Sequence, residues 1–518
     1  MSLISKFITK ANEIANKCPF ILNSIKKILK LCPYLEEKIC KTIDKDNINK
    51  IIENKYKKIL LTKTGKEIFD IISSDKFKKN AQNKQEIDSI LTLIDNTFSN
   101  QIIDQTTAIK KLSNIINPQY DEFIISNIAQ RTAEYLYPQR DKYIFVDYSD
   151  LSKKDSGTGI QRVCKNILKL LTTISKKKVI PIYSDDITFY GFKYCSKLAL
   201  EEQKENDEVI EFIKGDILFF PELSTNNSIT QKEYLKFLKQ KGVKIVNLVY
   251  DLVPIRYPET CHITMAEIFP KYINSVLDYA NGAICDSLSV AEDLKEYIKE
   301  NRPDKIDNFK LEWIHLGSDF ENNSNSIGIP KDSDILFKAM ESRTTFLAVS
   351  TIEPRKMYDQ ILDTFDILWK QNKDINLVIV GKNGWNTEKL IKKLEHHKEL
   401  NKRLFKLSGI SDEYLNKIYE KSSALIMASK AEGFGLGIIE ATYHKKPLII
   451  RDIPVFREIA GENAFYFNGF EGKDLANTIE KWLNLYKENK HPKSDNIKYL
   501  TWKESIQMLN EKLELVTK

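Results

Sequence analysis

Residues Ala424–Ala441 read ALIMASKAEGFGLGIIEA, and this stretch decides how the second half of the chain is interpreted. ALIMAS is a short apolar run typical of a buried strand, and the residues from Gly437 onward have helical spacing. The glycine run between them predicts a strand-to-helix turn with free backbone N–H groups. Such a turn, with the helix dipole behind it, suits phosphate. Glu432 and Glu440 flank the turn, and both can face one ligand.

Strand-like and helix-like runs alternate along most of the remaining chain, which is typical of βαβ units and parallel sheets. A first cycle of strand-like runs covers 142–150, 179–184, 216–222, 244–251, 282–287 and 310–319. A second cycle covers 344–351, 375–382, 404–409, 424–429, 447–452 and 464–467. We therefore expect two doubly wound α/β domains in tandem, with ligands bound at the carboxyl ends of the strands.

The chain is too long for one hydrophobic core, because single cores stop growing at roughly 250–300 residues. We expect an all-helical N-terminal region over 1–135, a first Rossmann-like domain over 136–325 and a second over 326–500. The amphipathic pattern of 501–518 predicts a last helix that packs back toward the first domain. A polar stretch within 320–340 is expected to be the linker.

Charge and cysteine usage narrow the class of protein. Residues 1–60 contain 13 Lys and 6 Asp or Glu, which accounts for the whole net charge of +7. The rest is near neutral, which argues against a nucleic-acid partner. The seven scattered cysteines suit reduced thiols in a cytoplasm. No apolar run is long enough to span a bilayer and no signal peptide is evident, so we expect a cytoplasmic protein.

The N-terminal run FILNSIKKILKL, residues 20–31, has one apolar face and one lysine face. It permits peripheral contact with the inner face of a membrane. It equally permits a helical module that packs on the first domain, on another subunit of a homo-oligomer or on an acceptor.

The two glutamates around G-F-G-L have the E-x7-E spacing and resemble the motif of retaining glycosyltransferases of family 4, which have the two-Rossmann GT-B fold. The resemblance implies that Glu432 contacts donor-sugar hydroxyls and that Glu440 binds the nucleotide ribose. It also implies that the backbone of the turn meets the sugar and the diphosphate. The turn residues are Gly433, Phe434, Gly435 and Leu436.

Residues 353–356 read EPRK and resemble the family's basic diphosphate clamp, in a form similar to that of bacterial polysaccharide mannosyltransferases. The resemblance implies that Lys356 is the family's lysine and that Arg355 replaces the usual arginine. Gly409 and Ile410 fall where the family approaches the base of the nucleotide.

The first domain carries matching segments. DSGTGIQRV, residues 155–163, is similar to the family's glycine loop, which implies that Gly157, Gly159 and Arg162 face the donor or acceptor. Tyr250 and Asp251 stand where the family often has His-Asp. Asp251 is therefore a catalytic candidate, and Tyr250 replaces a histidine that touches the donor sugar.

The resemblance implies a hexosyltransferase that moves a sugar from a nucleotide-sugar donor to a glycan or glycolipid, with retention of configuration. Mannose from GDP-mannose is the best guess, in the synthesis of a bacterial surface polysaccharide such as lipopolysaccharide. The phosphate charge would be stabilised by Arg355, Lys356 and the helix N-terminus, with no metal and no cofactor.

Other readings of the same residues stay open. The two glutamates permit a helix cap, and the glycine run with Asp452 permits a dinucleotide-binding loop, although Ile438 occupies the third fingerprint position. A nucleotide-sugar epimerase of the same fold and a catalytically inactive glycan-binding scaffold are the alternative functions.

Overall fold

The computed structural model describes residues 140–518 apart from 156, 185–188, 199–207, 319–327 and 332. Before residue 140 it describes 58–59, 122–135 and the single positions 65, 66, 68, 69, 93, 94, 97, 108, 111 and 112. Helix α8 (Glu122–Tyr135) agrees with the helical prediction for this region, whereas strand β1 (Lys58–Ile59) shows that "all-helical" is wrong at that point. Residues 20–31 lie outside the described residues.

The first domain is built on a seven-stranded sheet with the order β5-β3-β2-β6-β7-β8-β9. All neighbouring strands are parallel except the edge pair β3 and β5. The strands are β2 (Ile144–Asp147), β3 (Val179–Tyr183), β5 (Lys193–Tyr194), β6 (Ile217–Phe220), β7 (Lys244–Val249), β8 (Gly282–Cys285) and β9 (Lys310–Trp313), and β4 (Phe189–Tyr190) lies outside this sheet. The helices are α9 (Ser149–Lys153), α10 (Gly159–Ile174), α11 (Thr225–Thr230), α12 (Lys232–Gln240), α13 (Val253–Arg256), α14 (Ile263–Tyr279) and α15 (Leu288–Asn301). Short 3-10 turns are η1 (Ser196–Leu198), η2 (Pro258–Thr260) and η3 (Pro303–Lys305).

The second domain has an entirely parallel six-stranded sheet with the order β12-β11-β10-β13-β14-β15. Its strands are β10 (Thr344–Val349), β11 (Ile375–Val380), β12 (Leu404–Leu407), β13 (Ala424–Met427), β14 (Leu448–Arg451) and β15 (Phe465–Phe467). Its helices are α16 (Ser333–Ser342), α17 (Tyr358–Lys370), α18 (Glu388–Glu395), α19 (Asp412–Lys421), α20 (Leu436–Tyr443), α21 (Pro454–Ala460) and α22 (Gly472–Lys487), with 3-10 turns η4 (Pro354–Lys356) and η5 (Ser494–Asn496). The prediction of two doubly wound parallel-sheet domains, the architecture of the GT-B fold, is confirmed.

Each predicted strand-like run contains an observed strand, but all the strands except β15 end earlier than the runs do. The run 310–319, for example, contains β9 only to Trp313. The predicted linker is partly wrong, because α16 occupies the end of that stretch and buries Leu336 and Met340 one helical turn apart. The strands of the second sheet are mostly buried on both faces, as expected when helices cover a parallel sheet.

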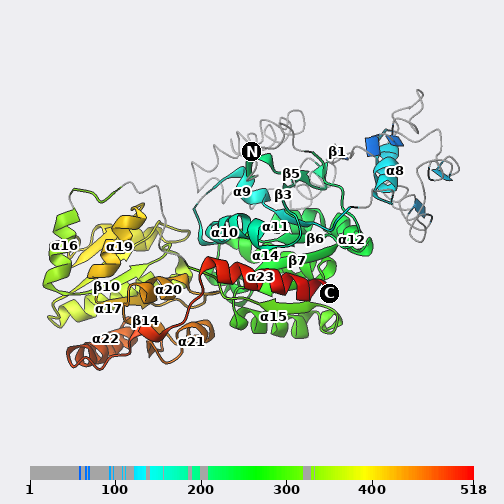
Figure 1. Cartoon of the computed structure of the whole chain (residues 1–518). Coiled ribbons are helices and arrows are strands. Elements are labelled where there is room, and N and C mark those ends of the chain that lie inside the picture. Colours follow the sequence, from blue (N-terminus) through cyan, green and yellow to red (C-terminus); the bar gives the residue numbers. More distant parts are fainter. Residues whose placement is uncertain are drawn as a thin grey trace, which may run out of the picture. The chain divides into compact units, whose positions relative to one another are not determined.

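The chain returns to the first domain at its C-terminal end. Helix α23 (Trp502–Thr517) packs against α10 and against β7, β8 and β9, and Figure 1 shows it in red across the first domain. Just before it, the backbone of Leu500 accepts a hydrogen bond from Ser318 N. A Cβ at Gly317 would lie 2.4 Å from the Cα of Trp502, so only glycine permits this close crossing.

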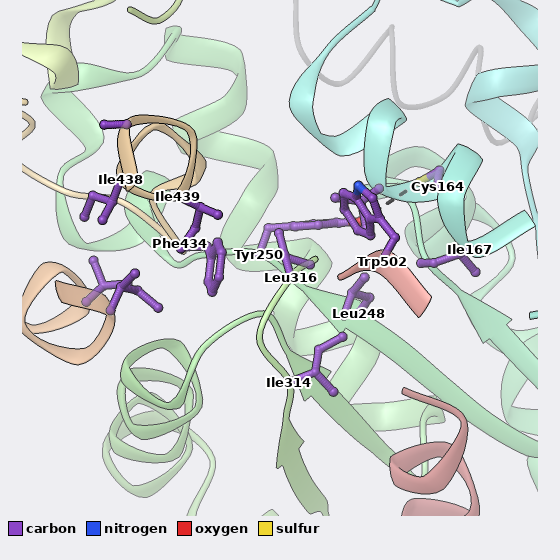
Figure 2. Close-up of a cluster of buried hydrophobic side chains, with 14 of the residues drawn as sticks. Cys164, Ile167, Leu248, Tyr250, Ile314, Leu316, Phe434, Ile438, Ile439 and Trp502 are labelled. Carbon is purple, nitrogen blue, oxygen red and sulfur yellow. Dashed lines mark hydrogen bonds between the residues drawn. The ribbon is translucent and has the colours of Figure 1, made fainter. Parts of the chain in front are cut away.

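One apolar cluster includes side chains of both domains. Phe434 and Ile439 of the second domain share it with Tyr250, Leu316 and Trp502. Figure 2 shows these side chains together, with Phe434 and Tyr250 near the centre of the view. The glycine turn is therefore anchored in apolar packing as well as in its own strand and helix.

Candidate active site

The residues of the site lie at the topological switch point of the second sheet. β10 leads into Glu353–Lys356 and its neighbour β13 leads into the turn 429–435. The chain connects β10 to β11 on one side and β13 to β14 on the other, so the two turns open a crevice between them. Ligands bind at such crevices in open α/β sheets.

Arg355, Lys356 and Glu432 form one cluster in that crevice. Arg355 Nη1 donates to Glu432 Oε2 over 2.6 Å, and Lys356 Nζ donates to Glu432 Oε1. Ser429 Oγ donates to the same Oε1 over 2.7 Å. The side chains of Lys356 and Glu432 are only 13% and 7% exposed. The structure thus brings together three predicted catalytic residues from two separate loops.

Mutual attraction keeps these groups charged despite their burial. Burial raises the pKa of Glu432, but the charges of Arg355 and Lys356 outweigh it and hold that pKa at about 2. Burial and the nearby Arg355 lower the pKa of Lys356, and Glu432 opposes this change. Burial also acts against the charge of Arg355, yet Glu432 and Glu353 raise its pKa above the usual value. The crevice therefore holds two buried basic side chains that share one carboxylate.

Asp251 joins this cluster from the first domain. It follows β7 and accepts a hydrogen bond from Val253 N over 3.0 Å. Burial raises its pKa, and the charge of Arg355 partly offsets that rise. The fourth predicted catalytic residue, Asp251, is therefore close enough for the positive charges of the second domain to lower its pKa.

The glycine turn meets the first domain directly. A Cβ at Gly433 would lie 1.8 Å from the carbonyl oxygen of Tyr250, and Ser287 Oγ donates to the carbonyl of Gly433 over 2.7 Å. Gly435 has φ of 96° at the N-cap of α20, a conformation that favours glycine. Within the described part of the chain, the N–H groups of residues 433–435 have no hydrogen-bond acceptor. They are available to an anionic ligand.

Phe434 and Leu436 play a packing role in this turn. The Phe434 ring is buried, with its centroid 5.6 Å from that of His315. Leu436 packs against the apolar cluster that both domains share. The expectation that these two residues contact the donor therefore concerns their backbone, since their side chains face protein.

Arg162 and Glu440 also come together from separate domains. Arg162 Nη1 donates to Glu440 Oε1 over 3.1 Å, and Tyr419 Oη donates to Oε2 over 3.1 Å. Gly159 is the first residue of α10, and Gly157 lies in the preceding loop with φ of 64°. The predicted glycine loop thus starts the helix whose Arg162 reaches Glu440.

Gly409 and Ile410 form no hydrogen bond with Arg162 or Glu440 in the part of the chain that the structure describes. Gly409 has φ of 66° with open space around it, and Ile410 packs against the shared apolar cluster. They follow β12, which lies two strands from β10 on the same side of the switch point.

Tyr250 does not take the place of the family's histidine. Its hydroxyl donates to the carbonyl of Pro221 over 2.6 Å, and the side chain is buried among core residues of the first domain. Asp452 is the residue that a dinucleotide-binding loop would use, and Arg457 donates hydrogen bonds of 2.7 and 2.9 Å to its carboxylate. The Tyr250 side chain is therefore not left to bind a nucleotide sugar.

Residues 332–499 match the family model described as "Glycosyl transferases group 1". This group 1 region includes the whole second sheet, both loops of the cationic cluster and Glu440.

Curated relatives extend over more of the chain. The "Serotype-specific mannosyltransferase WbdA" of Escherichia coli is 36% identical over 456 residues, which are 86% of this chain and 54% of that protein. The "O-antigen chain mannosyltransferase RfbU" of Salmonella typhimurium is 25% identical over 232 residues, covering 45% of this chain and 59% of that protein. The chain spans about half the length of the first of these relatives. Among solved structures, sucrose-phosphate synthase from Thermosynechococcus elongatus aligns with a TM-score of 0.48 at 14% identity, covering 73% of this chain and 96% of that one.

Two acids that the sequence did not single out lie where the group 1 region meets the first domain. Glu458 on α21 accepts from the N–H groups of Leu288 and Ser289 at the start of α15, and from His315 Nε2 over 2.7 Å. Asp286 follows β8, is buried, and its Oδ1 has no hydrogen-bond partner among the described residues. Its strand-end position is the signal that could have identified it, as for Asp251. Glu458 lies within a helix and carries no such signal.

The corresponding crevice of the first sheet, between β2 and β6, is filled by the domain's own groups. Asp147 accepts from Ser149 Oγ over 2.5 Å and from Ser224 Oγ over 3.1 Å. Glu222 accepts from the N–H groups of Asp150 and Leu151 at the start of α9. Burial raises the pKa of Asp147 to about 7 and that of Glu222 to about 8. These acids act as internal structure, and the group 1 region supplies the open crevice.

Among the described residues, no group of three or more His, Cys, Asp or Glu side chains has a metal-binding arrangement. No helix in the same part of the chain is both long and apolar enough to cross a bilayer.

Proposed function

We propose that this protein is a retaining hexosyltransferase of family 4 that transfers mannose from GDP-mannose to a glycan or glycolipid acceptor during synthesis of a bacterial surface polysaccharide. The observation that carries the proposal is the buried cluster of Arg355, Lys356 and Glu432 beside the unbonded amides of the glycine turn. Two cations and a set of aligned N–H groups match a diphosphate, and a carboxylate at the same place matches sugar hydroxyls. The names of the relatives support mannose as the sugar.

In the proposed mechanism, the bond between the anomeric carbon and the diphosphate oxygen breaks while the acceptor oxygen attacks from the same face. The acceptor proton passes to the departing phosphate oxygen. Arg355, Lys356 and the turn amides stabilise the charge on that phosphate without a metal ion, which is the electrostatic effect expected of preorganised donors. Glu432 orients the sugar through its hydroxyls. Asp251, whose pKa is raised by burial, would hydrogen-bond a sugar hydroxyl from the first domain.

Donor recognition would then divide along the crevice. The ribose diol of the nucleotide would displace Arg162 and donate hydrogen bonds to the carboxylate of Glu440, because each carboxylate oxygen can accept from a hydroxyl. The base would lie toward Gly409 and Ile410.

A panel of nucleoside diphosphate sugars tests the proposal. Thermal shift should single out GDP-mannose, and incubation with mannose oligosaccharides should yield an α-linked product from an α-linked donor. Binding of the donor without transfer would favour the inactive glycan-binding scaffold. Release of free sugar isomers without an acceptor would favour the epimerase, and failure of every donor to bind would contradict both enzymatic functions.

A further inference from the structure

A buried tyrosine holds the carboxylate to which the ribose contact is assigned. Tyr419 Oη donates to Glu440 Oε2 over 3.1 Å, and Tyr419 is only 1% exposed. The other carboxylate oxygen, Oε1, accepts from Arg162, whose side chain is 55% exposed. An exposed partner of this kind is displaced at low cost. One oxygen of Glu440 is therefore tied to the interior of the second domain, whereas the partner of the other can be exchanged for a ligand.

The ring of Tyr419 is itself held in place by a neighbouring helix. It is stacked on the ring of His444, with centroids 4.9 Å apart and an interplanar angle of 5°. Glu440 lies on α20 and His444 is the C-cap of the same helix, four residues later, so the two side chains share one face. His444 Nε2 in turn lies 3.3 Å from Oδ1 of Asn416 on α19. The stacking thus directs the Tyr419 hydroxyl to Glu440.

The Tyr419 hydroxyl remains a hydrogen-bond donor at neutral pH. Burial raises its pKa well above the usual value, and the charge of Glu440 raises that pKa further. A phenol O–H donates one hydrogen bond. Because this bond is made to Oε2, it sets the direction in which the remaining lone pairs of the carboxylate point.

A carboxylate of fixed direction discriminates between ligands more sharply than one that can rotate. A site built to pair with a ligand hydroxyl strongly rejects an analogue that lacks it, because a polar group of the site is then left without a partner. A carboxylate that can rotate finds water or the remaining hydroxyl instead. The bond from Tyr419 therefore bears on how well Glu440 recognises a complete ribose diol.

We propose that Tyr419 is a positioning residue which, by fixing Glu440, makes the donor site selective for a ribonucleotide that carries both ribose hydroxyls. The inference rests on the proposed ribose contact of Glu440. It goes beyond that contact because it assigns the selectivity between ribonucleotides and deoxyribonucleotides to a side chain behind the carboxylate.

Binding of GDP and of its 2′-deoxy and 3′-deoxy analogues to the full chain, measured by calorimetry, tests the inference. For the wild type, each analogue should bind about tenfold or more weakly than GDP, as expected for the loss of a hydrogen bond to a charged group. Tyr419→Phe removes only the hydroxyl oxygen. It should weaken GDP binding more than analogue binding, so the ratio of the two dissociation constants should fall about threefold or more.

Tyr279→Phe is the matched control. Tyr279 is also fully buried, and its hydroxyl donates to Ser228 Oγ over 2.9 Å within the first domain. Its loss should lower the melting temperature and leave the selectivity ratio unchanged. His444→Ala is a second test variant, because it keeps the Tyr419 hydroxyl but removes the ring that orients it. It should lower the ratio in the same direction as Tyr419→Phe.

Two further measurements show whether Tyr419 acts through Glu440. In a Glu440→Ala background, Tyr419→Phe should leave the Kd for GDP unchanged, because the partner of the hydroxyl is already absent. With GDP-mannose as donor, Tyr419→Phe alone should raise KM and leave kcat close to that of the wild type. A merely structural role would instead weaken the binding of all three nucleotides by the same factor.

The outcomes separate this inference from the proposed function. If the wild type transfers mannose but Tyr419→Phe and His444→Ala both keep the full selectivity ratio, the inference is wrong while the proposed function stands. An equal effect of Tyr419→Phe with and without Glu440, or a wild type that binds the analogues as tightly as GDP, also overturns the inference. If the wild type neither binds GDP-mannose nor transfers mannose, the proposed function fails and the inference fails with it.

Discussion

Arg162 Nη1 lies 3.1 Å from Glu440 Oε1, and this ion pair joins α10 of the first domain to α20 of the second. Arg162 is 55% exposed, so the pair contributes little to stability and can open at low cost. Glu440 can therefore exchange a side-chain partner for a ligand hydroxyl.

Glu440→Ala should raise the dissociation constant of the nucleotide sugar about tenfold or more, because a carboxylate that bridges a diol is lost. The rate at saturating donor should change little, since the ribose contact is the same before and during transfer. Calorimetry and saturation kinetics measure the two effects. Glu511→Ala on α23 is the control, and a large fall in kcat with unchanged affinity would contradict the assignment.

Lys356→Ala should lower kcat about 10²–10³-fold, as expected for the loss of one preorganised donor to a developing negative charge. Arg355→Ala should have a similar effect. Lys389→Ala, at an exposed position of the second domain, is the control. Circular dichroism and donor thermal shift must show that the variants fold. Near-normal turnover in a folded Lys356→Ala protein would show that the cluster does not act on the leaving group.

Combining Lys356→Ala with Glu432→Ala should lower the free energy of unfolding by less than the sum of the two single effects. Lys356→Ala leaves Glu432 with one cationic partner in place of two, and Glu432→Ala leaves Lys356 buried beside Arg355 without its ion pair. The double change removes both members of the Lys356–Glu432 pair. A double-mutant cycle on the free energy of unfolding measures the coupling. Strict additivity would mean that the pair seen here does not persist in solution.

Gly433→Ala should destabilise the protein and slow transfer, because its Cβ would occupy the position of the Tyr250 carbonyl oxygen. To relieve this clash, the turn must move away from the first domain, which breaks the hydrogen bond from Ser287 to Gly433. Thermal unfolding and kcat/KM check this. Gly159→Ala is the stability control, since the space around Gly159 is open and its φ is not positive. Equal melting temperatures for the two variants would argue against the close approach.

Stability should fall as the pH rises from about 5 to about 8. Asp147 and Glu222 have folded-state pKa values of about 7 and about 8, above those of the unfolded chain, so the folded state binds more protons in this range. Their stabilising contribution is complete below the unfolded pKa values and is lost as the pH rises through the folded ones. Melting temperature against pH shows the effect, and Asp147→Asn should flatten it. If the melting temperature of Asp147→Asn depends on pH as steeply as that of the wild type, groups other than Asp147 cause the pH dependence.

The sequence predicted the two sheets from local patterns, and the cluster of Arg355, Lys356 and Glu432 from the resemblance to the glycosyltransferase family. Apolar runs mark the parallel strands, and Glu432, Arg355 and Asp251 all follow such runs. Contacts made by closing one domain on the other could not be predicted in this way. The bonds from Ser287 to Gly433 and from Ser289 to Glu458 join residues 146 and 169 positions apart, and no periodicity specifies them. Helix α16 was not predicted because polar residues precede Leu336 and Met340, the two apolar positions that it buries.

Helix α23 also constrains the order in which the protein can form during translation. The sheet of the first domain has been synthesised by Trp313, but the helix that covers β7, β8 and β9 is translated only after the entire second domain. Until then the apolar surface that Trp502, Leu509 and Leu513 later cover has no partner from this helix. Domains usually fold as units from the N-terminus onward during synthesis. Here the second domain can be complete while the first still waits for residues 502–517 to leave the ribosome.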